Sequence, residues 1–222
     1  MKNKKINNVL IMAAGRGMRM MPLTKKIPKA MAPIKGSTLI AKGIKKVHKF
    51  FNNVHVTVGY KGELLAKHVI ELNVNSIFNT NKKGNSWWIF NTLLKNLDEP
   101  LFVLTCDNLY NIDFFVQLNE YKKIGKPACM IVPVKSHHDL DGDYILYNKN
   151  NINKISRKKS SDLQCSGVQI INPLKINELA NKEDNFYKVW NKLIKIEQVK
   201  LSKFCLSNWR AIDNLEQLNK IK

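Results

Sequence analysis

A short segment near the N-terminus carries residue types that bind phosphate. Residues 10–31 read LIMAAGRGMRMMPLTKKIPKAM, an apolar run followed by small residues and cations. The small residues let backbone N–H groups approach an anion closely, because no side chain stands in the way; they are Ala13, Ala14, Gly15 and Gly17. Arg19 offers a planar fork for phosphate oxygens, and Lys29 adds a mobile point charge one loop later. Together these residues are candidates for binding a triphosphate and for neutralising charge at a reacting phosphorus.

Two common phosphate-binding motifs are excluded. A P-loop requires G-x-x-x-x-G-K-[ST], which occurs nowhere in the chain. A dinucleotide-binding fingerprint requires G-x-G-x-x-G, but Met20 stands where the third glycine belongs. A turn that needs glycine for steric reasons alone remains the simplest alternative.

A carboxylate follows one of the apolar runs. Asp107 comes directly after LFVLTC, residues 101–106, which read as a buried strand. In open α/β sheets, ligands bind at the carboxyl ends of the strands. Mg²⁺ binds few protein carboxylates together with substrate phosphates. Asp107 is therefore a candidate Mg²⁺ ligand facing the phosphate loop.

Alternating elements predict the scaffold for these residues. Apolar runs of strand length occur at 8–12, 54–59, 101–106 and 128–134. Stretches of helical spacing lie at 39–51, 63–72, 87–97 and 114–121. This alternation predicts an α/β fold: a single Rossmann-like domain with a mainly parallel, mixed central sheet and helices on both faces.

The pattern changes after residue 135. Residues 142–156 read as two short strands joined by an asparagine-rich turn, and 164–173 as another strand. Helical spacing returns at 185–196 and 214–221. We expect this β-rich part to extend the same domain.

Composition narrows the function classes. The net charge is +20, but arginine occurs at only four positions and the lysines are spread along the chain. A nucleic-acid reader usually concentrates arginine-rich charge on one element, so a smaller polyanion such as a nucleotide is the expected partner. No apolar run reaches the roughly 20 residues of a membrane helix, and a cytoplasmic protein is expected. The cysteines are too scattered for a zinc site, which predicts buried free thiols.

The opening segment resembles the signature of a nucleotidyltransferase family. The matching pattern is G-x-G-x-R-[LM]-x-P-L-T followed by P-K, here residues 15–24 and Pro28-Lys29. The family makes nucleotide sugars and related compounds, and it includes phosphocholine cytidylyltransferases. The resemblance implies Mg²⁺-dependent transfer of NMP from UTP, CTP, GTP or dTTP to a phosphorylated small molecule, with release of pyrophosphate. It also implies a nucleotide-binding part, 1–134, and an acceptor-binding and closing part, 135–222.

The resemblance assigns roles to further residues. Arg19 and Lys29 match the catalytic cations, and LSNWRAID, residues 206–213, resembles a closing motif that makes Asp213 a second metal ligand beside Asp107. Helix capping by Asp213 or Asn214 is the alternative. Nucleotide contacts are expected from Ala13, Ala14, Gly15, Gly17, Arg19, Asn85 and Ser86. Acceptor contacts are expected from Gly142, Asp143, Lys158 and Gly167, with Arg157 and Lys159 competing for the role of Lys158.

The acceptor stays open at this point. A sugar 1-phosphate in cell-surface polysaccharide synthesis is the leading expectation, and phosphocholine or an aminophosphonate with CTP is the alternative. A non-catalytic nucleotide- or polyanion-binding protein is the alternative from another class. Trp87 and Trp88 either bind a quaternary ammonium by cation–π contact or pack on the sheet, Trp87 in line with Phe90, Leu94 and Leu97. The segment HHDLDGDYILY, residues 137–147, reads as a substrate-side loop rather than a metal site.

Overall fold

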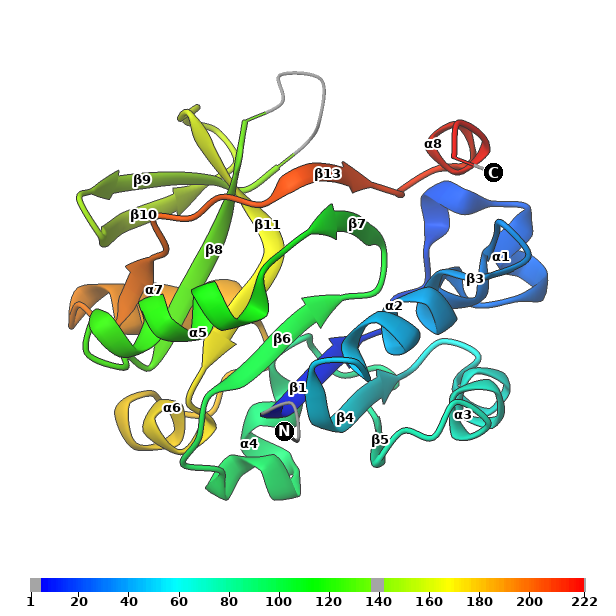
Figure 1. Ribbon diagram of the computed structural model, residues 1–222, viewed down its shortest axis with the longest axis horizontal. Coiled ribbons are helices and arrows are strands. Elements are labelled where there is room, and N and C mark those ends of the chain that lie inside the picture. Colours follow the sequence, from blue (N-terminus) through cyan, green and yellow to red (C-terminus); the bar gives the residue numbers. More distant parts are fainter. Residues whose placement is uncertain (1–4, 137–141, 222) are drawn as a thin grey trace. The chain divides into compact units, whose positions relative to one another are not determined.

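The structure is a computed structural model that describes residues 5–136 and 142–221 (Figure 1). The chain divides into two compact units. Unit 1 comprises Met1–Lys83, Leu104–Leu109 and Arg210–Lys222, and unit 2 comprises Gly84–Val103 and Tyr110–Trp209. The residues of the signature segment, Asp107 and Asp213 all belong to unit 1.

Parallel strands form the sheet of unit 1. Its order is β5-β4-β1, with β1 at Ile6–Met12, β4 at Phe51–Val58 and β5 at Ser76–Asn79. The carboxyl end of β6 (Leu101–Thr105) follows β1, and the Cys106 N–H donates to the Met12 carbonyl at 3.2 Å. β6 is apolar except for Thr105, and β1 is apolar from Val9 onward, as expected of buried parallel strands. Their carboxyl ends bring the loop after Met12 beside the loop after Thr105.

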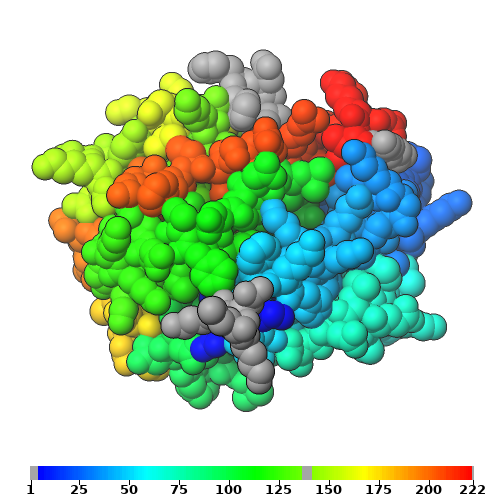
Figure 2. All heavy atoms as spheres, viewed as in Figure 1, coloured from blue at the N-terminus to red at the C-terminus, as the bar shows by residue number. Residues whose placement is uncertain are grey.

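Helices α2 (Leu39–Val47) and α3 (Gly62–Ile70) connect the strands of unit 1. In α2, Leu39, Ile40, Ile44 and Val47 are buried, and the helix lies across β1 and β4 (Figure 1). Thr38 caps α2 by accepting the Ala41 N–H at 3.1 Å. α3 lies at the surface, where its spheres are turquoise (Figure 2), and only Leu65 and Val69 are buried.

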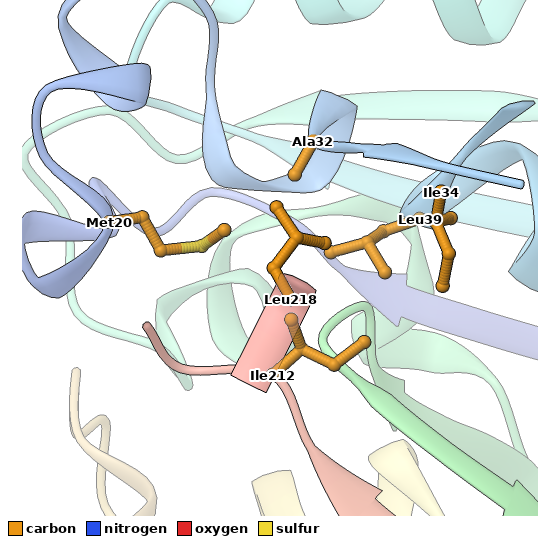
Figure 3. Packing of buried hydrophobic residues seen from close by; sticks show 6 residues of the cluster. All are labelled: Met20, Ala32, Ile34, Leu39, Ile212 and Leu218. Atoms are coloured by element: carbon orange, nitrogen blue, oxygen red, sulfur yellow. The ribbon is translucent and has the colours of Figure 1, made fainter. Parts of the chain in front are cut away.

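Short elements complete unit 1 and enclose a small apolar cluster (Figure 3). They are η1 (Met18–Met20), α1 (Leu23–Lys26), η2 (Lys29–Met31), β2 (Pro33–Ile34), β3 (Ser37–Thr38) and α8 (Leu215–Asn219). The cluster consists of Met20, Ala32, Ile34, Leu39, Ile212 and Leu218, whose side chains point toward one another. It fastens the signature segment to the C-terminal segment, because these residues come from both.

Unit 2 contains a mixed sheet with strand order β6-β11-β8-β12-β10-β9. The strands are β8 (Cys129–Lys135), β9 (Tyr144–Asn148), β10 (Asn151–Ser156), β11 (Leu163–Ile171) and β12 (Val199–Leu201). β8 pairs antiparallel with β11 and parallel with β12. β9 and β10 form an antiparallel hairpin. β7 (Asn108–Asn111) and β13 (Ser207–Ala211), each of which has residues in both units, form a separate two-stranded sheet.

The helices of unit 2 are α4 (Trp87–Asn91), η3 (Leu93–Asn96), α5 (Phe114–Lys123), α6 (Pro173–Leu179) and α7 (Phe186–Lys195). Asp113 caps α5 by accepting the Phe115 and Val116 N–H groups. In α7 the apolar face is formed by Phe186, Val189 and Leu193, which are buried. Within the described ranges, no helix has both the length and the apolar character that a membrane crossing needs.

The predicted α/β class, the mixed sheet and the asparagine-turn hairpin are confirmed. The predicted helix over 87–97 is wrong, because Thr92 is extended (φ −121°, ψ 175°) and splits the segment into α4 and η3. Helix α6 was missed, although Asn172 and Pro173 form a recognisable start: Asn172 accepts the Lys175 N–H and proline occupies the first turn. The division of the chain at residue 134 stays a prediction.

Candidate active site

The loop after β1 is held against the loop after β4. The Ala13 N–H donates to the Thr57 carbonyl at 3.2 Å, and the Tyr60 N–H donates to the Ala14 carbonyl at 3.1 Å. A Cβ on Gly59 would lie only 2.7 Å from the Ala14 carbonyl oxygen, so this approach requires glycine. The path of the predicted phosphate loop is therefore fixed by its neighbour.

Gly17 has two reasons to be glycine. Its φ of +66° lies in the left-handed region. A Cβ on it would also lie 2.7 Å from Cβ of Lys29, and 3.2 and 3.3 Å from Cγ and Cδ of that side chain. The Thr24 hydroxyl donates to the Gly17 carbonyl at 3.0 Å. The glycine thus lets the loop rest directly on the lysine side chain.

Lys29 joins two carboxylates from distant parts of the chain. Its Nζ donates to Asp107 Oδ2 at 2.6 Å and to Asp213 Oδ1 at 2.8 Å, and the residue is only 9% exposed. Burial by itself lowers the pKa of Lys29, but the charges and hydrogen bonds of both carboxylates outweigh burial and raise that pKa. Lys29 therefore stays an ammonium group at neutral pH.

Arg19 completes the cluster from the exposed side. Its Nη2 lies 3.2 Å from Asp213 Oδ1, and its side chain is 63% exposed. The four groups Arg19, Lys29, Asp107 and Asp213 carry two positive and two negative charges, and each has a partner of opposite charge. Sequence reasoning predicted all four members, and the structure brings them together.

Hydrogen bonds of the neighbouring residues Ile212 and Asn214 hold Asp213 in place. The Ile212 N–H donates to the Asp107 carbonyl at 2.9 Å, which ties the two aspartate segments together. Asn214, and not Asp213, caps α8 by accepting the Gln217 N–H at 2.8 Å. This decides between the two capping alternatives and leaves the Asp213 carboxylate to the cluster. Ile212, beside Asp213, is buried in the apolar cluster of Figure 3.

The donor set fits Mg²⁺ of the kind that is bound together with a substrate. Asp107 and Asp213 both lie within 2.8 Å of one Nζ atom, so their oxygens converge on one small volume. The described residues contain no group of three or more His, Cys, Asp or Glu that would form a protein-only metal cage. Mg²⁺ typically uses one or two carboxylates plus phosphate oxygens and water. The two aspartates match that requirement.

Asn85 and Ser86, the predicted nucleotide-binding residues of unit 2, form side-chain hydrogen bonds to other residues of unit 2. The Ser86 hydroxyl donates to the Glu183 carbonyl at 2.8 Å and is buried, and Asn85 Oδ1 accepts the Phe186 N–H at 2.9 Å. Ser86 occupies the N-cap position of α4, but its side chain makes no capping hydrogen bond. The side chains of Asn85 and Ser86 are instead hydrogen-bonded to residues 183–186. Nucleotide contact by these two residues stays a prediction.

The predicted acceptor residues lie around the β9–β10 hairpin and β11. Asp143 Oδ1 accepts a hydrogen bond from Nε of the exposed Arg157 at 2.8 Å. Lys158 is exposed, and its N–H donates to the Ser156 hydroxyl. A Cβ on Gly142 would lie 2.9 Å from the Gln164 side chain, and Gly167, at φ +82°, stands at the bulge of β11. His137 and His138 lie outside the described residues.

The two tryptophans differ in how far they are buried. Trp88 is 1% exposed, donates from Nε1 to the Asn85 carbonyl at 3.0 Å, and contacts Phe186 edge-on. Trp87, whose spacing is in line with Phe90, Leu94 and Leu97, is half-buried. The buried residues of α4 are Trp88, Ile89 and Phe90. Trp88 is therefore a core residue.

The cysteines are free thiols, as predicted, but the prediction that they are buried is wrong for Cys205. Cys129 is buried, whereas Cys205 is exposed. Burial raises the pKa of the Cys129 and Cys165 thiols, so both are unreactive. Tyr60 is a feature that the sequence analysis overlooked; its hydroxyl donates to the Thr24 carbonyl at 2.9 Å beside the signature loop. The G-Y pair directly after a buried strand was the available signal.

Curated relatives match part of this chain. A curated relative, the bifunctional protein GlmU of Methanocaldococcus jannaschii, is 26% identical over 204 residues, covering 87% of this chain and 48% of its own length. The GlmU of Methanococcus aeolicus is 38% identical over 61 residues, 28% of this chain and 15% of its own. The chain thus matches less than half the length of these relatives.

Solved structures share the fold at low sequence identity. The inositol-1-phosphate CTP transferase from T. maritima superposes with a TM-score of 0.77 at 21% identity, covering 97% of this chain and 93% of its own. The CTP:phosphocholine cytidylyltransferase from Streptococcus pneumoniae gives 0.74 at 20% identity, with 96% of each chain covered. The family model described as nucleotidyl transferase matches residues 8–141, which include the signature loop and Asp107. The chain belongs to the nucleotidyl transferase family.

Proposed function

We propose that this nucleotidyltransferase uses Mg²⁺ to transfer NMP from an NTP to a sugar 1-phosphate, releasing pyrophosphate. The observation that carries the proposal is the cluster in unit 1, where the buried Lys29 ammonium bridges Asp107 and Asp213 beside the signature loop. A protein that merely bound polyanions would have no need for two carboxylates at the phosphate site. The family and the cluster together support catalysis.

The reaction is an in-line displacement at the α-phosphorus. An oxygen of the acceptor phosphate forms the new P–O bond while the bond to the β-phosphate oxygen breaks, and pyrophosphate leaves. Lys29 neutralises charge at the α-phosphate, and Arg19 grips phosphate oxygens with its fork. Mg²⁺, held by Asp107 and Asp213, supplies further charge neutralisation when bound. The backbone of residues 13–17 orients the phosphates, so positioning and electrostatics account for most of the catalysis.

The acceptor side is assigned to unit 2. Lys158 orients the acceptor phosphate, assisted by the Gly142-Asp143 segment and Gly167. Asn85 and Ser86 contribute to the nucleotide side through the backbone, because their side chains are engaged with residues 183–186. We place the reaction in the cytoplasm, where the product would serve as a precursor of cell-surface polysaccharide.

A CTP-dependent cytidylyltransferase for phosphocholine or an aminophosphonate is the second candidate. It is favoured by the two fold relatives whose names specify CTP. The buried state of Trp88 weighs against it, because the two tryptophans cannot both stand at an acceptor pocket to hold a quaternary ammonium.

The test is a pyrophosphate-release assay with Mg²⁺, each of UTP, CTP, GTP and dTTP, and a panel of phosphorylated acceptors. We expect release with one NTP and a sugar 1-phosphate. Release with CTP and phosphocholine, but with no sugar phosphate, would replace the proposal by the second candidate. If no combination of NTP and acceptor released pyrophosphate, the result would favour a non-catalytic nucleotide-binding protein.

A further inference from the structure

The acidic residues of the chain are unevenly distributed. Residues 1–62 contain no Asp or Glu, and all 17 acidic residues lie at 63–222. The lysines, in contrast, occur throughout the sequence. Within Met1–Lys83, the largest piece of unit 1, the two carboxylates belong to Glu63 and Glu71, and neither forms an ion pair among the described residues. The positive charge of this piece is therefore largely uncompensated from within.

Helix α2 arranges part of this charge in a row. Lys42, Lys45 and Lys49 are three and four residues apart, so they follow one another along one face of the helix and the turn that continues it. The buried Ile40 and Val47 lie on the opposite face. Lys45 and Lys49 are exposed, and Lys42 is half-buried. α2 reaches the surface on the face shown in Figure 2, where its spheres are light blue.

Lys5 adds a fourth cation at the C-terminal end of this row. Its Nζ donates to the His48 carbonyl at 2.8 Å, although Lys5 itself precedes β1. Lys5, Lys42, Lys45 and Lys49 together are called the lysine ridge. Among the residues that the structure describes, no member of the ridge forms an ion pair with a carboxylate.

The ridge carries an energetic cost that unit 1 does not offset. Like charges three and four residues apart destabilise a helix. In α7, by contrast, Lys188 and Lys192 both pair with Glu183. The dipole of α2 favours cations in its last turn, which accounts for Lys45 but not for Lys42. An external anion would supply the missing compensation.

The composition of the ridge favours lipid headgroups over nucleic acid. Its cations are all lysines, which act as point charges, whereas nucleic-acid readers rely on the arginine fork. Proteins that bind single strands add aromatic platforms for the bases. The exposed large apolar residues described in unit 1 are Met18, Leu64 and Ile70, and none of them is aromatic. A cluster of four lysines on an amphipathic helix is typical of binding to anionic lipid.

We propose that the lysine ridge binds unit 1 reversibly to anionic lipid headgroups at a membrane surface. The contact is electrostatic and peripheral, since the apolar face of α2 is buried in unit 1 and cannot enter the bilayer. Each lysine near such a surface strengthens binding about fivefold, and lysines within one Debye length act together. No ridge residue belongs to the cluster around Lys29, so binding requires no catalysis. On the proposed function, the nucleotide-linked product is then released beside the membrane that a cell-surface polysaccharide must cross.

The test is flotation of the protein with vesicles of phosphatidylcholine alone and with vesicles of phosphatidylcholine and phosphatidylglycerol in equal parts. We expect binding only to the anionic vesicles, and weaker binding as salt rises, because salt screens exposed charges. Lys45→Gln combined with Lys49→Gln should lower the partition coefficient about 25-fold. The matched control combines Lys122→Gln with Lys123→Gln, which removes the same charge from exposed positions in the last turn of α5; its effect should stay within about twofold.

The outcomes separate the ridge from a general effect of net charge. No binding to the anionic vesicles, equal binding to both kinds of vesicle, or equal losses in the two double variants would each overturn the proposal. Fluorescence anisotropy with a single-stranded RNA and a duplex DNA tests the other polyanions: ridge-dependent binding there, without vesicle binding, would assign the ridge to nucleic acid instead. Because flotation needs neither nucleotide nor acceptor, its result is independent of the pyrophosphate-release assay.

Discussion

The two units hold their functional charges in opposite ways. In unit 1, Lys29 is buried between Asp107 and Asp213, and Arg19 pairs with the same Asp213. In unit 2, Lys158 is exposed, and the side chain of Arg157 is 80% exposed although it pairs with Asp143. One set of charges is neutralised internally and fixed by neighbouring backbone, and the other faces solvent.

This difference corresponds to two different tasks. Charges that act on a reacting phosphorus work best when they are fixed in advance, because no energy is then spent on reorienting them during the reaction. A surface that meets a variable acceptor loses little by being open, since exposed ion pairs contribute only small energies. On the proposed function, unit 1 sets the chemistry and unit 2 sets the acceptor. The following changes test that contrast.

The largest expected effect comes from Asp107→Asn. The substitution keeps the shape but removes a negative charge from the pair that Lys29 bridges, so both metal binding and the position of Lys29 suffer. We expect turnover to fall by at least about 100-fold, as for other electrostatic groups at a reacting centre. The side chain is 27% exposed, so the free energy of unfolding should change by only about 1 kcal/mol. Pyrophosphate release and thermal unfolding, measured on the same sample, check both statements.

A fully active Asp107→Asn enzyme would contradict the metal assignment. Asp113→Asn is a suitable control, because Asp113 caps α5 by accepting two backbone N–H groups. That variant should lose stability and keep the turnover of its folded fraction. Asp107→Asn should therefore lower turnover with little loss of stability, whereas Asp113→Asn should lower stability with little loss of turnover.

The second effect concerns Lys29 itself, which fills the volume between the two carboxylates. Lys29→Met should abolish most turnover and yet strengthen metal binding in the absence of nucleotide, because a cation no longer competes for Asp107 and Asp213. We expect the affinity for Mn²⁺, used as a probe for Mg²⁺ and followed by electron paramagnetic resonance, to rise about tenfold.

Lys25→Met provides the matched control for this measurement. Lys25 is exposed on α1, so its loss removes the same charge from the same segment without touching the carboxylates. Unchanged or weaker Mn²⁺ binding in Lys29→Met would show that the ammonium does not compete with the metal.

The sequence made the composition of the cluster predictable, but not its internal bonding. Arg19, Lys29 and Asp107 followed from residue types and motif spacing, and Asp213 followed from the resemblance of residues 206–213 to the closing motif of the family. That Lys29 bridges both aspartates depends on groups as far as 184 residues apart in the chain. Contacts of this kind arise from the folding of the whole unit, and local pattern carries no information about them.

In unit 2, features set by local sequence were predictable, and features set by distant residues were not. The β9–β10 hairpin was predictable because its turn and its alternation are local features. The burial of Ser86 and Trp88 was not, because it depends on residues 183–186 approaching α4 from far along the chain. The periodicity of residues 87–97 indicated a continuous helix, and the extended backbone of Thr92 overrides it.

The third effect tests how tightly the loop is tied to the lysine. Gly17→Ala must accept a φ of +66° and a contact of 2.7 Å with Cβ of Lys29. Gly36→Ala meets a similar φ of +71° with nothing within 4 Å, and so measures backbone strain alone. We expect Gly36→Ala to cost about 1 kcal/mol in the free energy of unfolding and Gly17→Ala about 2–3 kcal/mol.

Denaturant unfolding of the two variants checks this difference. Gly15→Ala serves as a baseline, because its new methyl group meets only open space and its φ is not positive; its change should stay within about 0.5 kcal/mol. Equal losses in Gly17→Ala and Gly36→Ala would mean that the Lys29 stem yields to the methyl group, and that the loop is less firmly fixed than the charges of unit 1 require.

The smallest effect is expected where the charge is exposed. Lys158→Met should raise the KM for the acceptor about fivefold, in line with the weak energies of exposed ion pairs, and leave kcat within about twofold. Lys159→Met is the natural comparison, because the N–H groups of both lysines donate to the same Ser156 hydroxyl, at 3.2 and 3.1 Å, so the turn should keep its shape in either variant. A larger KM change in Lys159→Met would transfer the acceptor role to that residue, and a large fall in kcat in either variant would break the contrast between the units. The contrast holds only if a lysine without a buried partner affects binding of the acceptor and leaves the chemical step alone.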